Sequence, residues 1–171
     1  MLNPPRPEGS ADLPGKDIMN ATSLLWHDLE LGQEFRSRTR TITESDVVSF
    51  AGHTGDYSEI HVSETVASAN GFGGRIAHGL LVLSYSHGLM LGGGLLADCA
   101  IAFLGISDWR FLKPVRLGDT ISVRFRIAEL RESRSSPDRG ILTFEVEVLN
   151  QHGEVVQAGR KSLMLSTGGA R

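Results

Sequence analysis

The sequence predicts an α+β domain in which an antiparallel sheet wraps around one long buried helix. The first observation is an apolar segment at about residues 77–96, whose leucines, tyrosine and methionine lie nearly all round a helical wheel. The second is that four later segments alternate like β-strands and are separated by turn signals. A helix that is apolar on most sides needs a surface to cover it, and a sheet of successive strands can supply one.

The chain is expected to begin with an arm rather than with the domain. Residues 1–22 are rich in Pro, Gly and small polar types, so we expect a flexible arm followed by one domain at residues 23–171. The first strand is expected at residues 35–42, where basic residues alternate with apolar or hydroxyl residues.

Two short helices are expected between this strand and the long helix. Thr43 caps the first, since Asp46 three residues later forms a near capping box, and this helix should end at residues 52–55. The second follows Ser63 and closes at Gly71, because glycine suits the left-handed conformation after a helix.

The last part of the chain is expected to be all strand. The glycines at residues 92–94 have no phosphate-loop context, and we interpret them as a break in the long helix. Strands are then expected at residues 103–111, 120–130, 140–149 and 155–165. With the first strand, this gives a five-to-six-stranded antiparallel sheet.

Composition limits the class of protein. The chain has 171 residues, enough for one domain with a sizeable core, and a formal net charge of -3, which provides no basic surface for nucleic acid. Its single cysteine, Cys99, excludes an intramolecular disulfide and fits a reducing cytoplasm. The amino terminus lacks an export signal, and charged, histidine and glycine residues interrupt the most apolar stretch, so we expect a cytoplasmic protein with no membrane span.

The chemistry-bearing run extends from Gly55 to His61. A loop that holds the Asp56 carboxylate and the His61 imidazole a few residues apart can bind one water between them and move a proton to a neighbouring carbon. The Gly79 amide opens the long helix, where free N–H groups and the helix dipole can stabilise an oxyanion. Without further evidence, Asp56 could equally form an Asx-turn, His61 could pack at a helix start, and His78 could be a core histidine.

Three motifs change that balance, and together they resemble the MaoC-like dehydratases, also called (R)-specific enoyl-CoA hydratases. They read GDYSEIH, FGGRIAHG and FLKPVRLGDT, in that order, within residues 26–165. The resemblance implies a hotdog fold, at least a homodimer, and reversible addition of water to a trans-2-enoyl thioester carried by CoA or an acyl carrier protein. It also implies Asp56, His61 and Gly79 as catalytic residues, and no metal or organic cofactor.

The chain departs from the family pattern at one place. Ser58-Glu59 replaces the usual Asn-Pro, which removes a rigid proline and adds a carboxylate that could perturb the protonation of His61. The expected substrate-binding residues are Ser58, Arg75, His78, His87 and Lys113, with Arg116 as a further cation for a phosphate. The cations could equally be solvated surface charges, and His87 could only pack.

Two other functions remain open from the sequence. An acyl-CoA thioesterase on the same scaffold would activate water to attack the thioester carbonyl instead of C3. A non-catalytic acyl-thioester-binding subunit would bind ligand without turnover, and the Ser58-Glu59 departure is its only support.

Overall fold

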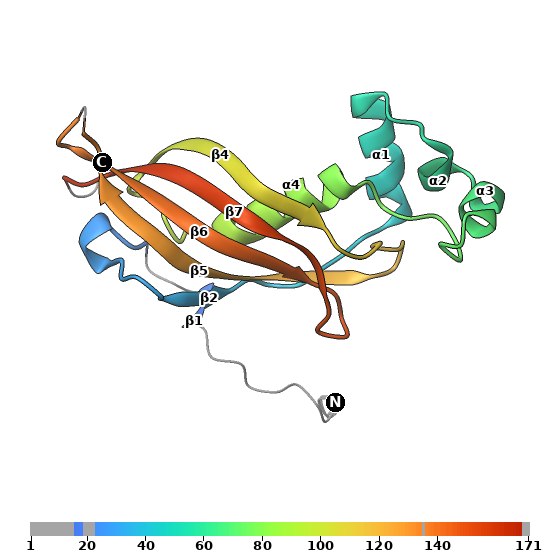
Figure 1. The fold of residues 1–171 in the computed structure, drawn as a ribbon, viewed down its shortest axis with the longest axis horizontal. Coiled ribbons are helices and arrows are strands. Elements are labelled where there is room, and N and C mark those ends of the chain that lie inside the picture. Colours follow the sequence, from blue (N-terminus) through green and yellow to red (C-terminus); the bar gives the residue numbers. More distant parts are fainter. Residues whose placement is uncertain (1–15, 19–22, 135, 169–171) are drawn as a thin grey trace, which may run out of the picture.

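The computed structural model describes residues 16–18, 23–134 and 136–168. A curved sheet wraps around the central helix α4 (Gly79–Leu91), and three shorter helices gather at one end (Figure 1). These are α1 (Glu44–Thr54), α2 (Glu59–Val62) and α3 (Glu64–Ala69), and a 3-10 turn lies at Trp26–Asp28. The architecture is the predicted hotdog fold. No helix in these ranges has the length and apolar character needed to cross a bilayer.

The sheet has the order β1-β2-β5-β6-β7-β4, with β3 also paired to β5. All pairs are antiparallel except β1 with β2. The four long strands predicted after α4 are confirmed, with ends that differ by a few residues. The bounds are β1 (Lys16–Asp17), β2 (Glu34–Arg36), β3 (Arg40–Thr41), β4 (Ala100–Phe111), β5 (Thr120–Glu132), β6 (Arg139–Leu149) and β7 (Val155–Ser166).

The prediction of a flexible arm is wrong for residues 16–18. Lys16–Asp17 pair in parallel with β2, and Ile18 is only 2% exposed within the core. The burial of this apolar side chain and the pairing with β2 both act against the entropy of ordering a polar segment. The rest of the predicted arm, residues 1–15 and 19–22, lies outside the described residues.

The single strand predicted at residues 35–42 is interrupted. Arg36 at the end of β2 lies opposite Arg124. Arg40 at the start of β3 lies opposite Ile121, so one more residue is used on this side than on β5. Ser37 fills the irregularity by bonding to β5 through both its N–H and its side chain.

The first helix begins as predicted, and α4 ends at the glycines that were predicted to break it, although the apolar segment predicted as helix continues to residue 96. Thr43 and Asp46 form a reciprocal capping box, with Asp46 Oδ2 accepting from the Thr43 N–H at 2.8 Å. The long helix stops at Leu91 because glycines follow, and a Cβ on Gly93 would lie 2.8 Å from the backbone oxygen of Ile18. The prediction that it is buried on most sides is also too strong, since Leu80 is 58% exposed.

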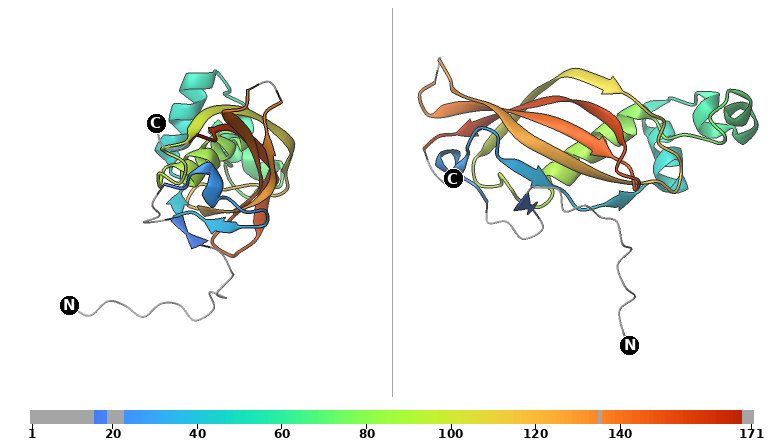
Figure 2. Two further views of the ribbon diagram at one scale, coloured as in Figure 1. Left: turned by 90° about the vertical axis from the view of Figure 1, so that its left-hand side faces the viewer. Right: turned by 60° about the horizontal axis from the view of Figure 1, so that its bottom comes forward.

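The core lies between α4 and the concave side of the sheet (Figure 2). At the end away from α1–α3, three phenylalanines contact one another, with Phe125 and Phe144 edge to face at 5.1 Å. A second cluster around Leu81 and Val82 packs beneath the start of α4. This packing fixes the helix start relative to the strands, and the candidate site lies there.

Candidate active site

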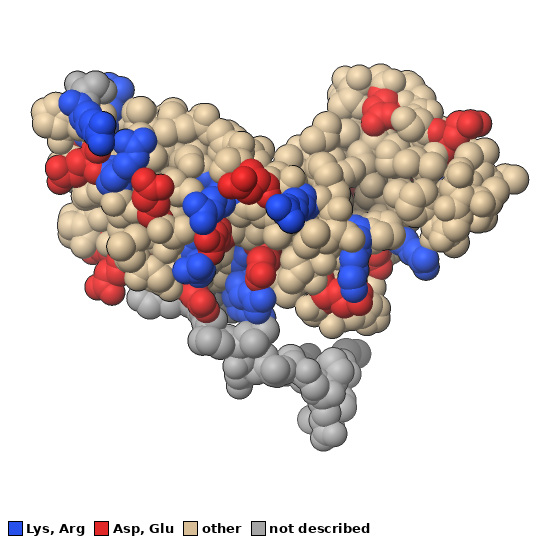
Figure 3. Space-filling model, in the orientation of Figure 1, with Lys and Arg blue, Asp and Glu red and all other residues tan. Residues whose placement is uncertain are grey.

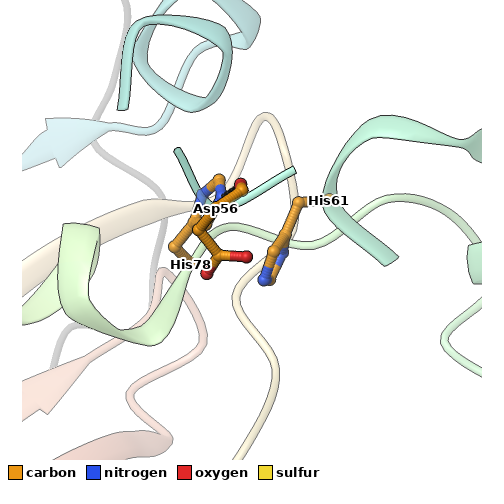
Figure 4. Close-up of side chains that lie close together, drawn as sticks. All are labelled: Asp56, His61 and His78. Carbon is orange, nitrogen blue, oxygen red and sulfur yellow. Dashed lines mark hydrogen bonds between the residues drawn. The ribbon is translucent and has the colours of Figure 1, made fainter. Parts of the chain in front are cut away.

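Asp56 occupies the loop that leaves α1. The helix ends because Gly55 adopts the left-handed conformation, with φ of 76°, and its N–H bonds to the Ala51 carbonyl at 2.8 Å. The next residues are therefore outside any helix, and α2 begins at Glu59. This turn brings the Asp56 carboxylate toward His61 (Figure 4).

Ser58 holds the Asp56 carboxylate. Its backbone N–H and its hydroxyl both donate to Asp56 Oδ1, at 3.2 and 2.6 Å. These hydrogen bonds are the main cause that lowers the pKa of Asp56 below its ordinary value. Burial opposes them, and the nearby imidazoles of His78 and His61 add smaller lowering effects. The Asx-turn expected of Asp56 and its proposed role in binding a water are therefore compatible with the same geometry. Ser58 supplies these hydrogen bonds at the position where the family pattern has Asn.

His61 lies on α2 and is only 7% exposed. Its Nδ1 lies 2.8 Å from the carbonyl oxygen of Ile76, and because a carbonyl can only accept, Nδ1 carries the proton. In the neutral ring, Nε2 is then a free acceptor. Burial lowers the pKa of His61, the bond to Ile76 opposes this, and the imidazole of His78 lowers it further. Glu59 is not among these causes, so the idea that it perturbs His61 gains no support.

His78 contacts both Asp56 and His61 but does not line the cavity beside them. Its Nε2 donates to the backbone oxygen of Asp56 at 2.9 Å, and its ring stacks against His61, with Phe50 on another side at 5.0 Å between centroids. The side chain is 2% exposed, and its Nδ1 has no hydrogen-bond partner among the described residues. The structure therefore places His78 as a support for the pair rather than as a surface for substrate.

The three side chains form a compact group. One carboxylate oxygen of Asp56 and one ring nitrogen each of His61 and His78 lie within 4.8 Å of one another. The two imidazole planes are 31° from parallel, and each ring donates one N–H to a backbone carbonyl. The spacing suits a single water, at hydrogen-bond lengths of about 2.8 Å, between Asp56 and His61.

A cavity of about 450 Å³ opens beside His61. Gly79 lines it as the first residue of α4, and no hydrogen bond to its N–H occurs among the described residues. Asp56 is exposed at the site and is not part of the cavity wall. Most of the wall is apolar, and it includes Ile60, Phe72, Ile76, Ala77, Leu80, Val82, Phe111, Leu112, Pro114 and Val115.

Comparisons with known proteins identify the family of the chain. A family model described as the MaoC like domain matches residues 28–148. The chain belongs to the MaoC-like hydratase and dehydratase family.

Full-length relatives of this MaoC-like chain include a named enzyme. It is 31% identical to the (R)-specific enoyl-CoA hydratase of Rhodospirillum rubrum over 154 residues, which cover 88% of this chain and 100% of that protein. The crystal structure of a MaoC-like dehydratase from the same organism superposes with a TM-score of 0.76 at 28% identity, covering 87% of this chain and 99% of the other.

Other matches are partial. The chain is 35% identical to protein MaoC of Klebsiella aerogenes over 99 residues, which cover 58% of this chain but only 29% of that protein.

Two of the cations predicted to bind substrate in this MaoC-like site form ion pairs with acidic residues of the protein. Arg75 pairs with Glu44 at 2.9 Å and with Glu64 at 3.3 Å, and so links α1 to α3. Lys113 lines the cavity while pairing with Glu154 at 2.5 Å. The face seen in Figure 3 likewise has acidic and basic groups interspersed.

Two further candidates lie apart from the group of three. The side chain of Arg116 lies near Gly73, where a Cβ would be 3.2 Å from its Nη2. His87 does not line the cavity and packs on Phe103 with ring centroids 4.6 Å apart. This contact agrees with the alternative stated from the sequence, in which His87 only packs.

One cavity residue, Gln157, was not predicted from the sequence. Gln157 on β7 lines the cavity and is 2% exposed. Alternate residues from position 157 to Leu165 face the core, so a polar residue in that series was a signal that strand periodicity could have revealed. The same series contains Lys161, which is fully buried.

Proposed function

We propose that the protein catalyses the reversible hydration of a trans-2-enoyl thioester to the (R)-3-hydroxyacyl thioester. The observation that carries this is the placement of the Asp56 carboxylate and the His61 imidazole close enough to share a water, beside an apolar cavity that Gly79 lines. An apolar wall fits an acyl chain, and a thioester carbonyl near Gly79 would have a hydrogen-bond donor. The name of the full-length relative in Rhodospirillum rubrum supports CoA as the carrier.

The proton path follows from the hydrogen bonds of His61. With Nδ1 committed to Ile76, the water donates one hydrogen to His61 Nε2 and the other to the Asp56 carboxylate. His61 takes the first proton as the water oxygen bonds to C3. The C2–C3 π electrons then move toward the thioester carbonyl, whose oxyanion accepts from the Gly79 N–H.

The second half-reaction restores the site. The enolate re-forms its carbonyl as C2 takes the proton from the His61 imidazolium, so the hydroxyl and the hydrogen add from one side of the substrate. Asp56 remains ionised throughout, since Ser58 stabilises its charge, and it attracts the transient imidazolium. Neither residue is consumed, and the reverse sequence is dehydration.

The assay that tests this uses a short trans-2-enoyl-CoA. Loss of absorbance of the conjugated thioester without release of free thiol is expected, and Asp56→Asn should abolish it. Asp138→Asn, in the turn before β6 at the opposite end of the sheet, is the matched control and should retain activity. Thiol release would instead indicate a thioesterase, and binding without either signal would indicate a non-catalytic subunit.

We also propose that the protein forms a homodimer through β4. This strand is an edge of the sheet, and it exposes Phe103, Leu104 and Ile106 by 42–44%. An apolar edge strand of this length is a template for pairing with another copy. Light scattering at micromolar concentration should give twice the chain mass, and a mass equal to one chain would contradict the proposal.

A further inference from the structure

A partly buried series of hydrogen bonds connects the start of α4 to the sheet. The side-chain Nε2 of Gln157 donates to the Gly79 carbonyl oxygen at 3.0 Å. Its Oε1 accepts from the indole Nε1 of Trp109 at 3.1 Å. These hydrogen bonds thus connect Trp109 on β4, through Gln157 on β7, to the first residue of α4.

This chain of bonds has only one possible direction. An indole N–H can only donate and a backbone carbonyl can only accept, so the amide of Gln157 must turn its oxygen to Trp109 and its nitrogen to Gly79. The orientation is therefore set by the partners at both ends. A rotated amide would leave the partly buried indole N–H of Trp109 and carbonyl of Gly79 without partners.

Gly79 needs an external restraint. A Cβ at this position would lie 2.7 Å from Cε1 of Phe111, so a side chain could fit only if that ring moved. Glycine, however, gives the first turn of a helix more backbone freedom than any other residue. The bond from Gln157 fixes the carbonyl of this glycine and limits that freedom.

Trp109 is itself held firmly enough to serve as an anchor. Its ring packs directly on Gly159, where a Cβ would lie 2.6 Å from the ring atom Cε3. The amine of Lys161, which is fully buried, lies 4.9 Å from the centre of the indole. Trp109 also packs against both halves of the core.

We propose that Gln157, oriented by Trp109, is a positioning residue that fixes the Gly79 N–H toward the oxyanion. The inference rests on the hydratase function proposed above. Because an oxyanion donor works only when it is already aimed at the developing charge, loosening it should lower kcat and leave KM nearly unchanged. A residue that only stabilised the fold would not produce that split.

The two tryptophans provide a matched pair of variants. Trp109→Phe keeps a ring but loses the N–H that orients Gln157. Trp26→Phe makes the same change near Gly140, away from the cavity. We expect kcat of Trp109→Phe to fall about tenfold, with KM within about twofold of wild type, and Trp26→Phe to keep the wild-type kcat.

Gln157→Met serves as a second variant, since it removes the donor at similar volume. In both Trp109→Phe and Gln157→Met, amide hydrogen exchange at residues 82–84, the first hydrogen-bonded amides of α4, should be faster than in wild type, and this is measured without substrate. Wild-type kcat and exchange in Gln157→Met, or equal losses in the two tryptophan variants, would overturn the inference. If the wild-type protein does not hydrate the enoyl thioester at all, the proposed function is overturned instead.

Discussion

The imidazole of His78 stacks on that of His61, with ring centroids 3.8 Å apart and planes 31° from parallel. Since His78 also donates to the backbone of Asp56, one buried side chain contacts both members of the proposed catalytic pair. The N-terminal boundary of α4 therefore controls the geometry of a loop that precedes it by some twenty residues.

Replacing His78 with Phe should test this support. Phe keeps an aromatic ring beside His61 but cannot bond to Asp56, and it also removes the unpartnered Nδ1. We expect kcat to fall about tenfold while the melting temperature changes little. Steady-state kinetics and thermal unfolding check this, with the exposed His53→Phe as control. Unchanged kcat in the His78 variant would remove the positioning role.

The pH dependence of the reaction should reflect His61. Burial lowers the pKa of His61 below its ordinary 6.5, so the imidazole becomes a neutral base at a lower pH than usual. As pH rises, kcat/KM should increase through a midpoint below 6.5 and then stay level near neutrality. A profile measured between about pH 5 and 8 would show it, and a midpoint above 6.5 would count against His61 as the base.

Lys161 should make the fold more stable in alkali than in mild acid. Burial lowers its pKa from 10.5 to about 7, so between these values the unfolded chain binds a proton that the folded chain does not. Stability should therefore rise as pH increases from about 7 toward 10.5. Lys161→Met should flatten this dependence in urea unfolding, because it removes the group that loses its proton on folding. An equal slope in variant and wild type would disprove the explanation.

Asp46 should also make stability rise with pH, but in the acid range. Burial raises the pKa of Asp46, but hydrogen bonds from Tyr85, Thr43 and Arg40 outweigh it and bring the value to about 2. Its contribution is therefore complete above 3.8 and is lost as pH falls through about 2. Asp46→Asn should cost about 1–2 kcal/mol at pH 7 and much less near pH 2, as measured by denaturant unfolding. An equal cost at both pH values would mean that charge plays no part.

The local features of the fold were largely predictable. Strand alternation located β4 to β7, and the Thr43–Asp46 spacing located the start of α1, because these signals depend only on near neighbours in the chain. The interruption at Ser37 and the pairing of Lys16–Asp17 with β2 depend instead on strands that are distant in sequence. Such effects cannot be read from a local pattern.

The candidate site likewise contains some residues that local motifs predict and others that only the fold brings together. The motifs brought attention to Asp56, His61 and Gly79, and the geometry groups the first two with His78. Gln157 was missed because its partners come from other elements. Ion pairing of Arg75 likewise required knowledge of where α1 and α3 meet.

The most direct test of the proposed function follows the oxygen of water. The enzyme would be incubated with a trans-2-enoyl-CoA in water enriched in oxygen-18, and the products weighed by mass spectrometry beside those of Asp56→Asn. Activation of water by Asp56 and His61 predicts an intact 3-hydroxyacyl-CoA with one heavy oxygen on C3, absent in the variant. Heavy oxygen in a released carboxylate, or equal labelling by the variant, would contradict it.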